Sequence, residues 1–113
     1  MPKHPALPGT YRITEMSEYD QDFVDADVEA YIQIDADGNG EFQFGYVCGS
    51  MTIEFTTRRG EPAAAWSWEG NDEMDDASGR GWAILEPDGS LKGKLFFHSG
   101  DSSDFVAAKK SGR

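Results

Sequence analysis

Short runs of alternating apolar and polar residues, each followed by a glycine-containing turn, constrain this chain most. Segments 31–34 and 41–44 alternate in this way around a turn sequence with two glycines, and segments 82–85 and 91–97 do so around 87–89. Successive side chains of a strand point to opposite faces, so a period of two predicts antiparallel strands joined by hairpins.

The pattern predicts an all-β domain spanning 1–113, with flexible tails at 1–8 and 110–113. Strands are expected at 9–16, 30–36, 40–48, 51–58, 63–69, 80–86, 91–98 and 104–109. About eight consecutive antiparallel strands must close or stack, and closure removes exposed edges. We therefore expect an up-and-down meander closed into a barrel, with a two-sheet β-sandwich as the alternative.

One helical segment is expected after the first strand. Ser17 and Asp20 resemble a capping box, and Phe23, Ala26 and Ala30 recur at helical spacing. One or two helical turns within 17–27 would cap one end of the barrel.

The register of the first hairpin follows from the apolar residues that must share a face. Ile34 opposite Phe44, with Tyr46 on the same face, requires a loop with an odd number of residues, most simply 38–40. A glycine there is expected at positive φ, so Gly40→Val should cost about 1–3 kcal/mol. In the later hairpin Leu85 is predicted opposite Leu91, and either face could be the core.

The composition limits the classes of function. No run of 18 apolar residues is present, the first residues lack a secretory signal pattern, and Cys48 is the single cysteine, so we expect a cytoplasmic protein. The net charge is −11, and residues 1–56 hold eleven acids against two basic residues. Such a field disfavours nucleic acid and anionic membranes and favours cations or a basic protein partner.

Two resemblances accompany this reading. Segments 9–16, 40–45, 66–70, 78–82 and 96–101 together resemble a family of small, acidic bacterial proteins that has no established activity. That likeness implies no catalytic residues. Separately, Gly9-Thr10-Tyr11 is similar to the Gly-x-Trp opening of lipocalin-type (calycin) barrels, with Tyr in place of Trp. This second likeness implies a barrel and gives no ligand.

A partial calcium-loop pattern occurs in the first hairpin. Asp35, Asp37 and Asn39 supply oxygen atoms at alternate positions, and Gly40 follows. The position of the bidentate glutamate is Tyr46, however, and Asp, Asn and Gly also suit a tight turn. We therefore favour a turn and expect neither a metal site nor a cofactor.

Three side chains near predicted strand ends could carry polar chemistry. Glu69 follows Trp68 and leads into an acidic segment, where an aromatic neighbour could desolvate it. His98 lies near Asp101, which could orient it as a base. A hydrolase or isomerase that uses Glu69 or His98 is our third hypothesis.

Our first hypothesis is a non-enzymatic barrel that binds a small apolar or aromatic ligand at its mouth. Trp66, Trp68 and Trp82 would line that site together with Glu69, His98 and Asp101. The structural alternative is that these tryptophans only pack in the core. The second hypothesis is an acidic interaction module, of the immunity or inhibitor type, that docks a basic partner.

Overall fold

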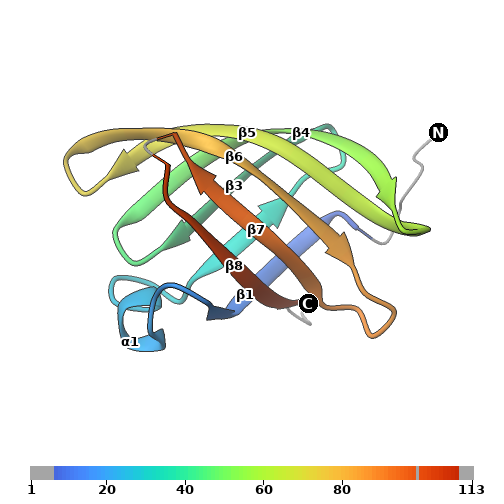
Figure 1. The fold of residues 1–113 in the computed structure, drawn as a ribbon, viewed down its shortest axis with the longest axis horizontal. Helices are drawn as coiled ribbons and strands as arrows, with labels where there is room; N and C mark the ends of the chain where they lie inside the picture. Colours follow the sequence, from blue (N-terminus) through green and yellow to red (C-terminus); the bar gives the residue numbers. More distant parts are fainter. Residues whose placement is uncertain (1–6, 99, 110–113) are drawn as a thin grey trace.

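The computed structural model describes residues 7–98 and 100–109 and confirms a closed barrel, so the sandwich alternative is wrong. Its eight antiparallel strands pair in chain order, and β8 returns to β1 (Figure 1). The strands are β1 (Gly9–Met16), β2 (Tyr31–Ile34), β3 (Asn39–Phe44), β4 (Val47–Arg58), β5 (Glu61–Asp72), β6 (Asp75–Leu85), β7 (Leu91–Phe97) and β8 (Ser102–Lys109).

The register predicted for the β2–β3 hairpin is wrong by several residues. Ile34 lies opposite Gly40 rather than Phe44, and Ile32 lies opposite Phe42. The loop still has an odd number of residues, 35–39, so the apolar side chains share the inner face as expected. The positive φ of 94° belongs to Gly38, whereas Gly40 lies within β3.

Gly40 remains a sensitive position for another reason. A Cβ atom there would lie 2.4 Å from the carbonyl oxygen of Gln33 and 2.8 Å from the Cε atom of Met51. The predicted loss of stability on Gly40→Val therefore stands, but its cause is close packing rather than φ.

Two further boundaries differ from prediction. The expected strand 40–48 is interrupted at Gly45 and Tyr46, which form a two-residue turn between the paired residues Phe44 and Val47. Tyr46 is consequently 43% exposed and does not join the core face. The acidic segment between the predicted strands 63–69 and 80–86 is largely a continuation of β5 and β6, which makes this hairpin long.

The β6–β7 hairpin has the predicted register. Leu85 pairs with Leu91 and Ala83 with Gly93 around the turn at 86–90. The structure also identifies the core face of this hairpin, because Ala83, Leu91 and Leu95 are buried in the barrel. Trp82 and Lys94, which alternate with them, therefore point outwards.

The structure confirms the expected helical segment as a single turn within 17–27. Helix α1 spans only Gln21–Val24, and its N-cap is Asp20 rather than Ser17, with the Asp20 carboxylate accepting a hydrogen bond from the Phe23 N–H. Tyr19 and Phe23 stack at 5.3 Å, and Tyr19 also contacts the ring of Phe44. The segment thus packs on the aromatic end of the core, beside the β3–β4 turn (Figure 1).

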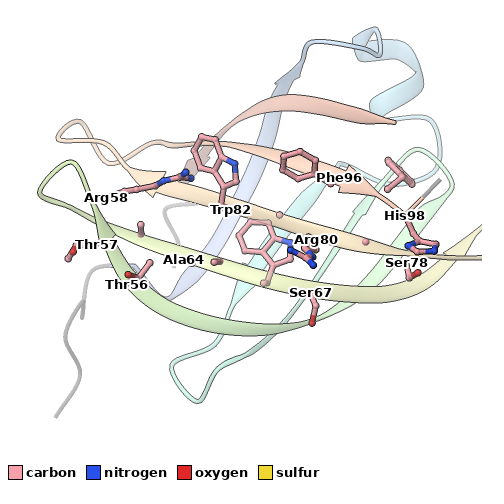
Figure 2. Close-up of a pocket in the computed structure, with 16 residues that line it drawn as sticks. Thr56, Thr57, Arg58, Ala64, Ser67, Ser78, Arg80, Trp82, Phe96 and His98 are labelled. Atoms are coloured by element: carbon pink, nitrogen blue, oxygen red, sulfur yellow. The ribbon is translucent and has the colours of Figure 1, made fainter. Parts of the chain in front are cut away.

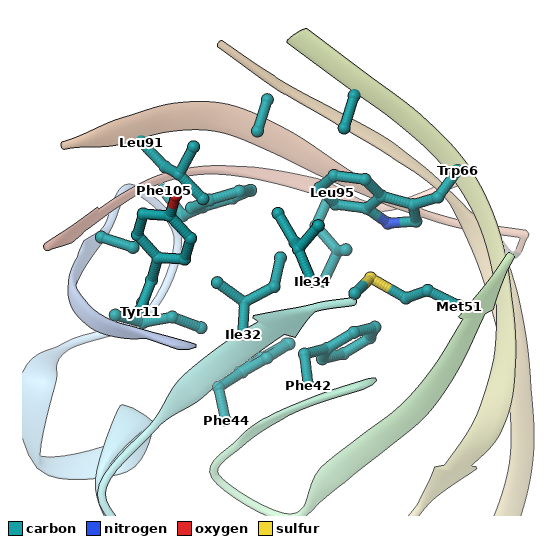
Figure 3. Close-up of a cluster of buried hydrophobic side chains, with 14 of the residues drawn as sticks. Tyr11, Ile32, Ile34, Phe42, Phe44, Met51, Trp66, Leu91, Leu95 and Phe105 are labelled. Atoms are coloured by element: carbon teal, nitrogen blue, oxygen red, sulfur yellow. The ribbon is translucent and has the colours of Figure 1, made fainter. Parts of the chain in front are cut away.

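Packed side chains fill the barrel interior (Figure 3). Tyr11, Phe44, Ile32 and Leu91 are fully buried, and the Tyr11 hydroxyl donates to the carbonyl oxygen of Leu7 at 2.6 Å. Leu7, assigned to the tail by sequence, is itself buried. Residues 1–6 and 110–113 of the predicted tails lie outside the described residues.

Candidate functional site: an outer groove across β5, β6 and β7

A groove of about 820 Å³ crosses the outer face of β5, β6 and β7 (Figure 2). Its side chains occupy the outward positions of each strand, where period-two alternation places them. They comprise two aromatic rings, two guanidinium groups, an imidazole and several hydroxyls: Trp82, Phe96, Arg58, Arg80, His98, Thr56, Ser67 and Ser78.

Trp82 forms the principal apolar wall of the groove. It is half-buried and lies between Ala65 of β5 and Lys94 of β7 in the sheet. The Arg58 guanidinium lies 4.1 Å from the centre of the Trp82 ring, close enough for a cation–π contact. A guanidinium carries five N–H donors, so Arg58 can contact the ring and also donate to an anion in the groove.

The floor is low because small residues occupy it. Ala65 and Ser67 of β5 face outwards, and Gly79 and Gly81 of β6 present bare backbone beside them. A Cβ atom on Gly81 would lie 2.5 Å from the Trp66 indole nitrogen. Gly81 therefore accommodates the buried Trp66 ring against the inner side of the sheet.

The structure separates the three tryptophans that the sequence grouped together. Trp66 and Trp68 point into the core, with exposed fractions of 4% and 3%, whereas Trp82 faces outwards. Trp68 packs edge-on against Phe42 and Phe97, and its indole N–H donates to the Phe96 carbonyl at 3.1 Å.

The Trp66 indole nitrogen is buried and has no hydrogen-bond partner among the described residues. Its ring lies among Leu95, Ile34 and Met51 inside the barrel (Figure 3). An unpaired buried N–H costs about 1–3 kcal/mol, so packing of this large ring must offset that loss.

A second hollow, of about 660 Å³, adjoins the groove at its His98 end. Glu69, Asp72, Asp75 and Asp76 line it together with His98, which is exposed. Glu69 points outwards opposite Ser78 and is also exposed, so Trp68 does not desolvate it. The acids thus form a solvated rim around this hollow.

Asp101 lies near the aromatic end of the barrel. Its backbone carbonyl accepts the Phe97 N–H at 2.8 Å. Burial is the main cause that raises the pKa of Tyr19, and the charges of Asp101 and Asp72 raise it further. Asp101 and Asp72 therefore lie close enough to Tyr19 to act on its ionisation.

The partial calcium-loop residues form local hydrogen bonds. The Asp37 carboxylate accepts the Asn39 N–H at 3.0 Å, and the Asp35 carboxylate accepts a hydrogen bond from the Gln33 side-chain amide at 3.0 Å. Within 7–98 and 100–109, no group of three His, Cys, Asp or Glu residues has an arrangement suited to a metal ion.

Sequence reasoning identified Trp82 and His98 but missed Arg58, Arg80 and Phe96. A usable signal was present: once β6 and β7 are aligned, residues 80, 82, 94 and 96 all share one face. Choosing that face as the outer one required knowledge of the core.

Comparison with known proteins adds no relative: no family model, curated protein or solved structure matches the chain. In the described part of the chain, no helix has the length and apolar character needed to cross a membrane. Chemically, the groove offers aromatic faces beside guanidinium donors, an arrangement suited to a ligand with an apolar body and a negative charge.

Proposed function

We propose that this protein is a non-enzymatic binding protein whose ligand site is the outer groove rather than the barrel mouth. The observation that carries the proposal is the pairing of Trp82 and Phe96 with Arg58 and Arg80 around a groove of about 820 Å³. This volume lies within the range of small-molecule sites, roughly 300–1,000 Å³. The interior, in contrast, is occupied by the protein's own side chains.

The lining favours a small organic anion with an aromatic or apolar body. Trp82 and Phe96 offer ring surface, and the guanidinium of Arg80 supplies donors for a carboxylate, sulfonate or phosphate. The positive groups are notable in a chain with net charge −11, because the overall field does not attract anions. Local contacts must therefore supply the recognition.

Two fluorescent probes test this proposal. Anilinonaphthalene sulfonate has an aromatic body and an anionic group, whereas N-phenylnaphthylamine has a similar body without the charge. We expect Trp82→Ala to weaken binding of both probes by about tenfold, and Arg80→Gln to weaken only the sulfonate probe by a similar factor.

Arg12→Gln is the matched control, because Arg12 is a surface cation outside the groove that pairs with Asp25 and Glu29. It should leave both affinities unchanged. Near-UV circular dichroism must show that each variant keeps its native packing, since partly folded protein also binds such probes. Unchanged probe binding in folded Trp82→Ala would refute the assignment of the groove.

The acidic hollow favours a second candidate function, docking of a basic protein. Glu69, Asp72, Asp75 and Asp76 gather there, and none of them has a Lys or Arg ion pair among the described residues. A lysine-rich peptide should bind at low salt, and the double variant Asp72→Asn, Asp75→Asn should weaken it. Equal binding by the double variant excludes this candidate.

A further inference from the structure

The distal part of β4 has an unpaired edge. Strand β3 pairs with β4 only as far as Thr52, and Ile53 donates its N–H to the Gly38 carbonyl at 2.7 Å. Beyond this point residues 54–58 pair with β5 alone. Within 7–98 and 100–109, no residue pairs with their other side.

The backbone groups on that edge follow from strand alternation. The Ile53 N–H points towards β3, so the N–H and C=O groups of Phe55 and Thr57 point the same way. Those of Glu54, Thr56 and Arg58 point towards β5. The edge therefore presents two donors and two acceptors, a pattern that can pair with another strand.

The two outer edges of the β4–β5 hairpin differ in their ability to pair with another strand. A turn with positive φ at Arg59 (51°) and Gly60 (81°) joins β4 to β5, as a tight two-residue hairpin requires. On the β5 side, the first residue without a β6 partner is Pro62, which has no N–H to donate. The β5 edge is thereby blocked, whereas residues 54–58 contain no proline.

We propose that two copies of this chain associate through antiparallel pairing of residues 54–58, which extends the sheet across a two-fold axis at Thr56. Only one register uses the edge-facing groups of both copies fully: it places Phe55 opposite Thr57 of the second copy. That hydrogen-bonded pair and its symmetry equivalent supply four backbone hydrogen bonds.

The same register makes the side chains self-complementary. It places Glu54 opposite Arg58 of the second copy, twice, at positions where side chains of facing strands approach closely. Charges on an edge strand normally discourage pairing, but opposite charges placed symmetrically about Thr56 select a second copy. Thr56 faces its own equivalent, and such threonine pairs are favourable across strands.

Neighbouring groups agree with this register. Arg59 of one copy would approach the loop at 35–39 of the other, beyond the end of the paired segment, and that loop holds Asp35 and Asp37. The Arg58 guanidinium lies 4.1 Å from the centre of the Trp82 ring, and its five N–H donors can also meet Glu54 of the second copy. One short strand pair buries little area, so the dimer should be weak and concentration-dependent.

Sedimentation equilibrium over about 1 µM to 1 mM protein tests the proposal, because a small interface predicts a dissociation constant in that range. The wild type should show a monomer–dimer equilibrium that weakens with added salt. Thr57→Pro removes an edge-facing N–H that has no hydrogen-bond partner among the described residues, so it should leave a folded monomer. A monomeric wild type throughout this range would overturn the proposal.

Charge reversal tests the register independently of proline. Glu54→Arg and Arg58→Glu should each weaken dimerisation by about tenfold, because two attractive pairs become repulsive. The double variant should return within about threefold of the wild type. A dimer that Thr57→Pro leaves intact, or a double variant no tighter than the single ones, would show that another surface pairs.

Discussion

Trp66 and Trp82 lie on adjacent strands and differ in nearly every physical respect. Trp66 is 4% exposed, packs among core side chains and leaves its indole nitrogen unpaired. Trp82 is half-buried on the outer face, with Arg58 over its ring. Period-two alternation places one ring in the core and the other in a surface groove. A tryptophan in this chain therefore indicates a binding site only if it is known to lie on the outer face of the barrel.

The largest expected difference is between the effects of Trp66→Ala and Trp82→Ala on the free energy of unfolding. Trp66→Ala should lower the free energy of unfolding by about 3–5 kcal/mol, because it removes a large core side chain and leaves a cavity. Trp82→Ala should cost less than about 1 kcal/mol, since the groove is open to solvent. Urea unfolding measures both, and equal losses would contradict the division between faces.

Gly81→Ala tests how tightly the inner ring rests on β6. The added Cβ would lie 2.5 Å from the Trp66 indole nitrogen, so the ring must shift, at a cost of about 1–3 kcal/mol. Ser67→Ala on the exposed outer face is the control, with a change within about 0.5 kcal/mol. Thermal unfolding compares the two, and a neutral Gly81→Ala would indicate a loosely packed interior.

Two tyrosines extend the comparison to alkaline pH. Burial raises the pKa of Tyr11 to about 12, and the hydrogen bond from Tyr31 to Glu41 is the main cause that raises the pKa of Tyr31 to about 12. Both folded-state values exceed the unfolded value of 10.0, so the stability they contribute is present below pH 10.0 and is lost as pH rises to about 12.

Tyr11→Phe should therefore reduce the alkaline loss of stability by about 1 kcal/mol at roughly pH 11. Added salt should diminish the contribution of Tyr31, which depends partly on the Glu41 charge, and leave that of Tyr11 unchanged. Urea unfolding at several pH values measures this. An unchanged alkaline slope in Tyr11→Phe would show that its hydroxyl reaches water.

The smallest effect is expected at an outer-face charge. The Lys94 ammonium lies 3.8 Å from the Asp104 carboxylate and 5.7 Å from the Phe96 ring centre, with Lys94 half-buried and Asp104 exposed. Lys94→Gln should change stability by no more than about 0.5 kcal/mol, because water screens such pairs. A larger loss in urea unfolding would mean that outer charges contribute to the fold.

The sequence predicted the barrel because its alternation and turns are local signals. The β6–β7 register followed from Leu85, Leu91 and the short turn between them. The β2–β3 register was wrong because alternation fixes which residues share a face but not how far the strands slide. Ile34 can face Phe44 or Gly40 with equal parity; in the structure it lies opposite Gly40, where there is no room for a Cβ atom.

The candidate site was less accessible to sequence reasoning. Trp66, Trp68 and Trp82 alternate with polar or small residues in the same manner, and nothing local distinguishes inner from outer. Which tryptophan faces inwards depends on how all eight strands close into the barrel, through long-range pairs such as Ile13 with Ala107. Arg58 reaches Trp82 across β5, a contact that spacing along the chain does not encode.

Hydrogen exchange of the three indole N–H groups, followed by NMR after transfer to D₂O, tests the division of inner and outer faces most directly. We expect the Trp82 signal to vanish first, and the Trp66 and Trp68 signals to persist until the barrel opens, because both rings are buried. Exchange of Trp66 as fast as that of Trp82 would contradict a filled barrel whose binding surface lies outside.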